Sequence, residues 1–116
     1  MEKTILLVDD EEGIRRVLAI ALSDIGYHVL TAENGAEALR IFEASRPQIV
    51  LSDIKMPEMD GMEFLQKIMA ESPIPVVICS ALTEKGSEAT LKAMEYGAVD
   101  IIQKPRERTK AFLEEY

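Results

Sequence analysis

Five polar residues in this chain follow short apolar runs: Asp9, Asp10, Asp53, Ser80 and Lys104. Carboxylate oxygens bind hard divalent cations such as Mg²⁺, and an aspartate can also accept a phosphoryl group as a covalent aspartyl phosphate. A hydroxyl and an ammonium group suit the oxygens of such a phosphoryl group. Taken alone, Asp53 fits a nucleophile, a metal ligand or a turn residue. The choice depends on what the fold places beside it.

The apolar runs predict the strands that position these residues. They span residues 5–8, 29–31, 49–51, 76–79 and 99–102. Segments with helical periodicity alternate with them, which is the pattern of βα units with a parallel sheet and right-handed crossovers. The runs are continuously apolar, as expected when helices cover both faces of the sheet. We therefore predict an α/β fold for residues 1–116 as one domain. It is a flavodoxin-like (βα)5 doubly wound sheet of five parallel strands in the order 2-1-3-4-5.

The helix boundaries carry local signals. Gly26 and Gly97 are placed as C-terminal stops, Asn34-Gly35 is a turn signal, and Asp60 is a candidate N-cap. The first helix should bury an apolar stripe that ends at Ile25. Residues 106–116 give the weakest helical pattern, because they carry few apolar side chains.

In the predicted strand order, the switch point lies between the first and third strands, where open α/β sheets bind their ligands. Asp9 and Asp10 should therefore face Asp53 across this crevice. Three crowded carboxylates repel one another unless a cation or shifted pKa values relieve them. The simpler alternative is that Asp9 or Asp10 caps the first helix. With Asp53 beside the pair, we favour an Mg²⁺ site.

Composition narrows the function classes. With 13 basic and 21 acidic residues, the net charge is −8, which argues against direct binding to nucleic acid or an anionic membrane. The single cysteine, Cys79, excludes an internal disulfide and is expected to be a buried packing thiol. His28 is expected at the surface, away from the crevice. No run approaches the roughly 18 apolar residues of a spanning helix, so we expect a cytoplasmic protein.

Taken together, the motifs resemble the receiver domain of two-component response regulators over essentially the whole chain, residues 1–116. The motifs that carry the resemblance are Leu7-Val8-Asp9-Asp10, Ser52-Asp53-Ile54-Lys55-Met56-Pro57, Met59-Asp60-Gly61, Ser80-Ala81, Gly97-Ala98 and Lys104-Pro105. The second half, including Pro75 to Ser80, Leu82 to Leu91 and Gly97 to Asp100, is similar to the receiver of chemotaxis methylesterases. Since no esterase motif occurs in these residues, that likeness implies a fragment or a free-standing relative.

The resemblance implies a role for each site residue. Asp53 would be the phosphoacceptor, with Mg²⁺ (Mn²⁺ substituting) bound by Asp10, Asp53 and the Lys55 backbone carbonyl, and by Asp9 through water. Ser80 and Lys104 would contact the phosphoryl oxygens, and the Lys104-Pro105 bond would be cis.

The resemblance also implies partners and a mode of action. The phosphoryl donor would be a sensor histidine kinase or a phosphotransfer protein. The output protein or domain would bind a face made by the fourth helix, the fifth strand and the last helix. The chain would be a switch that phosphorylates and dephosphorylates itself with Mg²⁺, rather than an enzyme with a separate substrate. Ile101 departs from the family, which usually places an aromatic residue there to read out the switch.

Two other functions share parts of this chemistry. A Mg²⁺-dependent phosphohydrolase with an aspartyl phosphate would need a second acid two residues after its nucleophile, where this chain has Lys55. A flavin-binding module of the same topology would need a phosphate loop after the first strand. The four acids from Asp9 to Glu12 would instead repel a flavin phosphate. The sequence therefore favours the phosphorylation switch.

Overall fold

A parallel sheet of five strands forms the centre of the computed structural model, which describes residues 3–53, 61–80 and 88–103. The strands are β1 (Thr4–Val8), β2 (His28–Ala32), β3 (Ile49–Ser52), β4 (Val76–Ser80) and β5 (Asp100–Gln103). Their order is β2-β1-β3-β4-β5, and each neighbouring pair is parallel. The predicted fold class and strand order are therefore confirmed.

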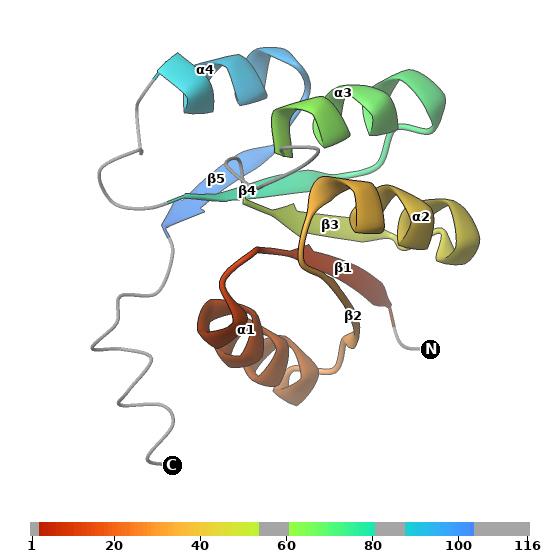
Figure 1. Cartoon of the computed structure of the whole chain (residues 1–116), viewed down its shortest axis with the longest axis vertical. Helices are drawn as coiled ribbons and strands as arrows, with labels where there is room; N and C mark the ends of the chain where they lie inside the picture. Colours follow the sequence, from red (N-terminus) through yellow and green to blue (C-terminus); the bar gives the residue numbers. More distant parts are fainter. Residues whose placement is uncertain (1–2, 54–60, 81–87, 104–116) are drawn as a thin grey trace.

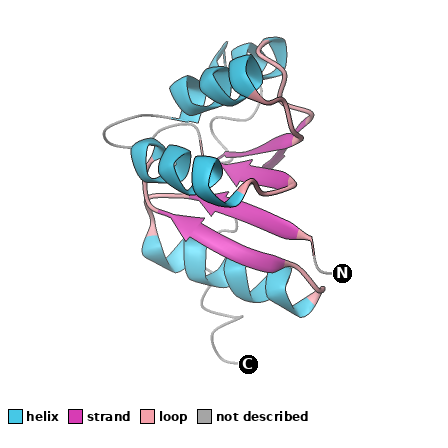
Figure 2. Ribbon diagram, turned by 90° about the vertical axis from the view of Figure 1, so that its right-hand side faces the viewer, coloured by secondary structure: helices cyan, strands magenta, loops and turns pink. Residues whose placement is uncertain are grey.

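Helices cover both faces of this sheet. They are α1 (Glu12–Asp24), α2 (Gly35–Ser45), α3 (Gly61–Glu71) and α4 (Glu88–Glu95). In Figures 1 and 2, α1 lies on one face, and α2, α3 and α4 lie on the other. The helix predicted for residues 106–116 lies outside the described residues.

The core consists of two layers of apolar side chains separated by the sheet. Along β1, Leu6 and Val8 join the larger cluster on the α2–α4 face, whereas Ile5 and Leu7 join the smaller cluster beneath α1. Alternate side chains thus enter opposite layers, as the two-residue repeat of a strand requires. Because both layers are buried, every residue in such a strand can be apolar, which explains the continuous apolar runs. Cys79 is buried in the smaller cluster, as predicted.

Several helix ends follow the local signals in the sequence. Asn34 is the N-cap of α2, and its side chain accepts a hydrogen bond from the Glu37 N–H at 2.8 Å. Gly26 and Gly97 follow α1 and α4 with φ of 105° and 113°, a backbone conformation that favours glycine. Asp60, the predicted N-cap of α3, lies outside the described residues.

The strand and helix limits differ slightly from the sequence prediction. Ser52, Ser80 and Gln103 extend the ends of their strands by one residue, because ladder hydrogen bonds use the backbone whatever the side chain. Ile25, expected at the end of the apolar stripe, is 72% exposed because α1 ends at Asp24 and the chain turns away. Among the described residues, no helix combines the length and apolar character needed to cross a bilayer.

Candidate functional site

The ends of β1 and β3 place two aspartates side by side. Asp9 follows β1, and its N–H donates to the Ala32 carbonyl at 3.1 Å. Asp53 follows β3, and its N–H donates to the Val8 carbonyl at 2.9 Å. These bonds continue the sheet ladders by one residue beyond each strand. Both aspartates therefore lie at the carboxyl edge of the sheet, between β1 and β3, where the strand order reverses.

The carboxylates of Asp9, Asp10 and Asp53 form one cluster. One oxygen from each lies within 4.8 Å of the others. Asp9 and Asp53 are 1% and 3% exposed, whereas Asp10 is exposed, so the cluster has two buried members and one member at the surface. Mg²⁺ usually takes one or two carboxylate oxygens from a protein and keeps several waters, so the donors present here fit the ion. At an effective dielectric constant of 20, two unit charges no more than 4.8 Å apart repel by at least about 3.5 kcal/mol. The cluster therefore favours a bound cation.

The turn between β1 and α1 is fixed by bonds to Asp9. Its Oδ1 accepts a hydrogen bond from the Glu11 N–H at 2.9 Å, and its carbonyl accepts one from Arg15 Nη1 at 2.8 Å. The N-cap residue of α1 is Glu11 rather than Asp9 or Asp10. The simple capping role considered for the two aspartates is therefore wrong, and Asp9 stabilises the turn that precedes the helix.

Sequence reasoning missed two residues whose side chains bond to the backbone of the clustered aspartates. The buried Ser52 hydroxyl donates to the Asp53 carbonyl at 2.8 Å, and the half-buried Arg15 holds Asp9 as described above. A signal for Arg15 was present, because a basic residue in the first turn of a helix opposes the helix dipole and needs another partner. A serine at a strand end carries no such signal.

The remaining predicted site residues are placed only in part. Ser80 is the last residue of β4, and it pairs with Gln103 of β5, so both strand ends lie at the carboxyl edge of the sheet. Lys55, Lys104 and the Lys104-Pro105 bond predicted to be cis lie outside the described residues.

Ile101, at the position expected for an aromatic residue, is half-buried and packs against the larger core cluster on the α2–α4 face. Its side chain is therefore part of the packing around β5.

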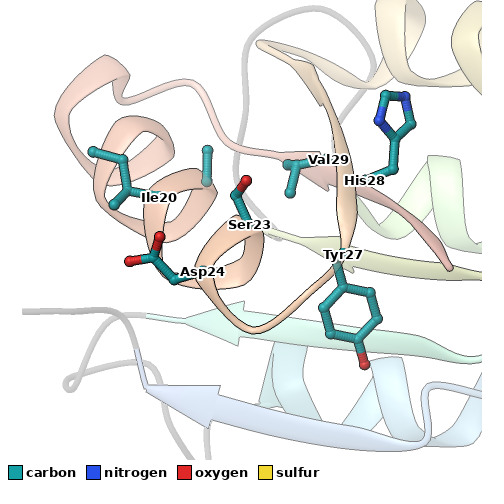
Figure 3. Close-up of a pocket in the computed structure, with 7 residues that line it drawn as sticks. Ile20, Ser23, Asp24, Tyr27, His28 and Val29 are labelled. Carbon is teal, nitrogen blue, oxygen red and sulfur yellow. The ribbon is translucent and has the colours of Figure 1, made fainter. Parts of the chain in front are cut away.

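A pocket of about 500 Å³ lies between the end of α1 and the start of β2 (Figure 3). Its lining residues are Ala19, Ile20, Ser23, Asp24, Tyr27, His28 and Val29. His28 begins β2 and is exposed, as predicted, whereas Ala32 at the far end of the strand bonds to Asp9. The pocket therefore contains none of the predicted site residues. It is separate from the aspartate cluster and is not the predicted phosphorylation site.

Comparison with known families places the acidic cluster in context. Residues 5–113 match the family model described as response regulator receiver domain. Curated relatives include a protein-glutamate methylesterase/protein-glutamine glutaminase of Oleidesulfovibrio alaskensis, 52% identical over 113 residues, which are 96% of this chain and 32% of that protein. A protein of the same description from Anaeromyxobacter dehalogenans is 45% identical over 115 residues, 99% of this chain and 33% of that protein. The chain thus spans about a third of the length of these relatives.

Solved structures agree with the family match. The response regulator domain of Thermotoga maritima CheB is 33% identical with a TM-score of 0.83, and the match covers 99% of this chain and 92% of that one. The chemotaxis protein CheY4 of Vibrio cholerae is 29% identical with a TM-score of 0.82, with coverage of 99% and 97%. The similarity therefore extends over the whole fold that carries the cluster.

Proposed function

The chain belongs to the response regulator receiver domain family, the phosphoacceptor domains of two-component signalling, and from this premise we propose that Asp53 is its phosphoacceptor. The donor is a phosphohistidine of a sensor histidine kinase or phosphotransfer protein. One observation carries the proposal. The carboxylates of Asp9, Asp10 and Asp53 lie within 4.8 Å of one another at the switch point of the sheet. We assign residues 1–116 to a single domain of this kind.

The surroundings of the three aspartates favour Asp53 as the nucleophile. Asp9 uses Oδ1 to accept the Glu11 N–H, which commits its carboxylate to the turn. Asp10 is exposed, so water competes for its oxygens. Asp53 is buried, and the bond from its N–H to Val8 holds its backbone at the end of β3, which favours a fixed position for in-line attack.

The transfer is a single displacement at phosphorus. An Asp53 carboxylate oxygen forms the new O–P bond while the P–N bond of phosphohistidine breaks, and the electron pair of that bond remains on the imidazole nitrogen. The product is an aspartyl phosphate and a histidine. The buried position of Asp53 limits the access of water to the phosphorylated side chain.

The carboxylates of Asp10 and Asp53, the Lys55 backbone carbonyl and, through water, Asp9 are the proposed ligands of Mg²⁺ or Mn²⁺. The bound ion supplies positive charge that offsets the charge on the phosphoryl oxygens. Ser80 and Lys104 are proposed to contact those oxygens. They would favour the active conformation by interactions present only after phosphorylation.

Ile101 limits the ways in which phosphorylation can change the surface of the domain. Because it is half-buried against the larger core cluster, a change around Ser80 would reach the surface through packing rather than through rotation of an aromatic ring. The output surface is proposed to be the face that includes α4 and β5. In and next to these elements, Leu91 of α4 and Val99, which precedes β5, are 60% and 58% exposed.

Phosphorylation can be tested by intact mass. The chain is incubated with a small phosphodonor such as acetyl phosphate, with Mg²⁺ or with EDTA. The wild type is expected to gain one phosphoryl group with Mg²⁺ only, and Asp53→Asn is expected to gain none. Asp24→Asn, which removes an exposed acid outside the cluster, is the matched control and should behave like the wild type. Undiminished labelling of Asp53→Asn would refute the assignment.

The output is proposed to be a protein-glutamate methylesterase. The relatives that match this chain at 52% and 45% identity carry that description, and this chain matches about a third of their length. The coding sequence beyond codon 116 tests the proposal. A reading frame that continues into an esterase domain would support it, and a frame that continues into a DNA-binding domain would contradict it.

A further inference from the structure

Arg15 is a basic residue where the helix dipole favours acids. It lies in the first turn of α1, three residues after Glu12, and its side chain is half-buried. A guanidinium at this position is repelled by the partial positive charge of the helix N-terminus. It is also costly to bury without a partner. Its position therefore requires a compensating interaction, and the structure provides one.

The compensating interaction spans the turn between β1 and α1. Arg15 Nη1 donates to the Asp9 carbonyl at 2.8 Å, and the Arg15 N–H donates to the Glu11 carbonyl at 3.0 Å. The Glu11 N–H in turn donates to Asp9 Oδ1 at 2.9 Å. Asp10 lies between these bonded residues, so the path of its backbone is set by bonds on both sides. The side chain of Arg15 thus closes a turn that contains two of the three clustered carboxylates.

We propose that Arg15 is a positioning residue for the cation site. By holding the Asp9 carbonyl, it keeps Asp9 and Asp10 at the spacing from Asp53 that a divalent ion requires. This proposal rests on the proposed function, because it assumes that the cluster binds Mg²⁺. Outer partners that orient metal ligands commonly change metal affinity by about 10- to 100-fold.

A role in charge balance alone predicts the opposite result. A guanidinium near three carboxylates repels an incoming cation, so removing its charge would tighten Mg²⁺ binding. If Arg15 holds the turn, its removal weakens binding, because Asp9 and Asp10 must then be ordered when the ion binds. The sign of the change in affinity therefore separates the two roles.

The test compares two arginines on the same helix. Arg15→Met removes the bond to Asp9, and Arg16→Met removes the same charge from a neighbouring exposed residue. Isothermal titration calorimetry with MgCl₂ measures the affinity of each full chain. We expect Arg15→Met to bind Mg²⁺ about tenfold more weakly than the wild type. Arg16→Met should stay within about twofold, as for ordinary surface substitutions.

Phosphorylation kinetics supply a readout that a loss of fold stability would not reproduce. In Arg15→Met, the Mg²⁺ concentration for half-maximal phosphorylation should rise by the same factor, about tenfold. The rate at saturating Mg²⁺ should stay within about twofold of the wild-type rate, because the ion then restores the turn. Arg15→Lys, which keeps the charge but replaces the guanidinium group whose Nη1 bonds to the Asp9 carbonyl, should also bind Mg²⁺ more weakly than the wild type.

Three results would overturn the positioning role. The first is that Arg15→Met binds Mg²⁺ with the same affinity as Arg16→Met. The second is that Arg15→Met binds Mg²⁺ more tightly than the wild type, and the third is that Arg15→Lys binds it with the wild-type affinity. Failure of the proposed function would look different. Labelling of Asp53→Asn would refute the phosphoacceptor assignment while leaving the calorimetric comparison of the arginine variants intact.

Discussion

Replacing Asp53 by Asn should stabilise the folded chain when no divalent ion is present. Asp53 and Asp9 are both more than nine-tenths buried, and their carboxylate oxygens approach within 4.8 Å. Asparagine has nearly the same shape as aspartate but no charge, so the substitution removes repulsion without leaving a cavity. A residue retained despite a cost to stability is typical of a functional site.

The gain can be estimated from this distance. Two full charges no more than 4.8 Å apart repel by at least about 3.5 kcal/mol at an effective dielectric constant of 20. Both aspartates have further interactions, which offset part of this repulsion, so we expect a net gain in the free energy of unfolding of about 1–2 kcal/mol. For a domain of this size, that gain should raise the melting temperature by roughly 4–8 °C.

Thermal unfolding followed by circular dichroism measures the effect, in EDTA and then in MgCl₂. Asp24→Asn is the control, since it changes the net charge equally, from −8 to −7, at an exposed site. At a Mg²⁺ concentration ten times the dissociation constant, binding stabilises the wild type by about 1.4 kcal/mol. Asp53→Asn should gain less from the ion, because it has lost one charged ligand. The difference between the two proteins should therefore shrink in Mg²⁺.

Two results would refute this reasoning. If Asp53→Asn melts at or below the wild-type temperature in EDTA, the clustered carboxylates do not repel one another as their spacing implies. If Asp24→Asn stabilises the chain as much as Asp53→Asn does, the gain reflects net charge rather than the cluster.

Two further predictions concern the elements that support the site. Asn34→Ala removes the side-chain bond to the Glu37 N–H and should lower the free energy of unfolding by about 1 kcal/mol in urea titrations. Gly97→Ala should destabilise more than Gly26→Ala in the same assay. Both positions have positive φ, but a Cβ at Gly97 would meet the Met69 sulfur at 3.2 Å, whereas nothing lies within 4 Å at Gly26. Equal losses would show that the contact with Met69 relaxes freely.

The strand order and the cluster could be predicted because they depend on repeated, redundant signals. Continuous apolar runs indicate strands covered on both faces, and the switch-point rule then brings Asp9 and Asp10 to Asp53. Each run needs only to be approximately located, because the carboxyl ends of parallel strands meet at one edge. Shifts of one residue in the limits of the strands did not alter the result.

The supporting contacts could not be predicted because they depend on the path of single side chains. Nothing in the sequence indicates that the Ser52 hydroxyl points to the Asp53 carbonyl. The position of Arg15 in the first turn of a helix indicates that it needs a partner, but not that the partner is the Asp9 carbonyl six residues earlier. The exposure of Ile25 was missed for a related reason, since helical periodicity does not show where a helix ends to within one residue. Patterns of apolar residues in the sequence predict helices and strands, whereas a single hydrogen bond depends on the positions of its side chains in the folded structure.

The central claim is that Asp53, rather than either of the two carboxylates beside it, accepts the phosphoryl group. Asp9, Asp10 and Asp53 are close enough that intact mass alone does not identify the acceptor. Borohydride reduction of the phosphorylated chain, followed by peptide mapping, converts the modified aspartate into a residue that mass spectrometry can locate. The proposed function predicts that the modification maps to Asp53. Modification of Asp9 or Asp10, with Asp53 unchanged, would contradict it.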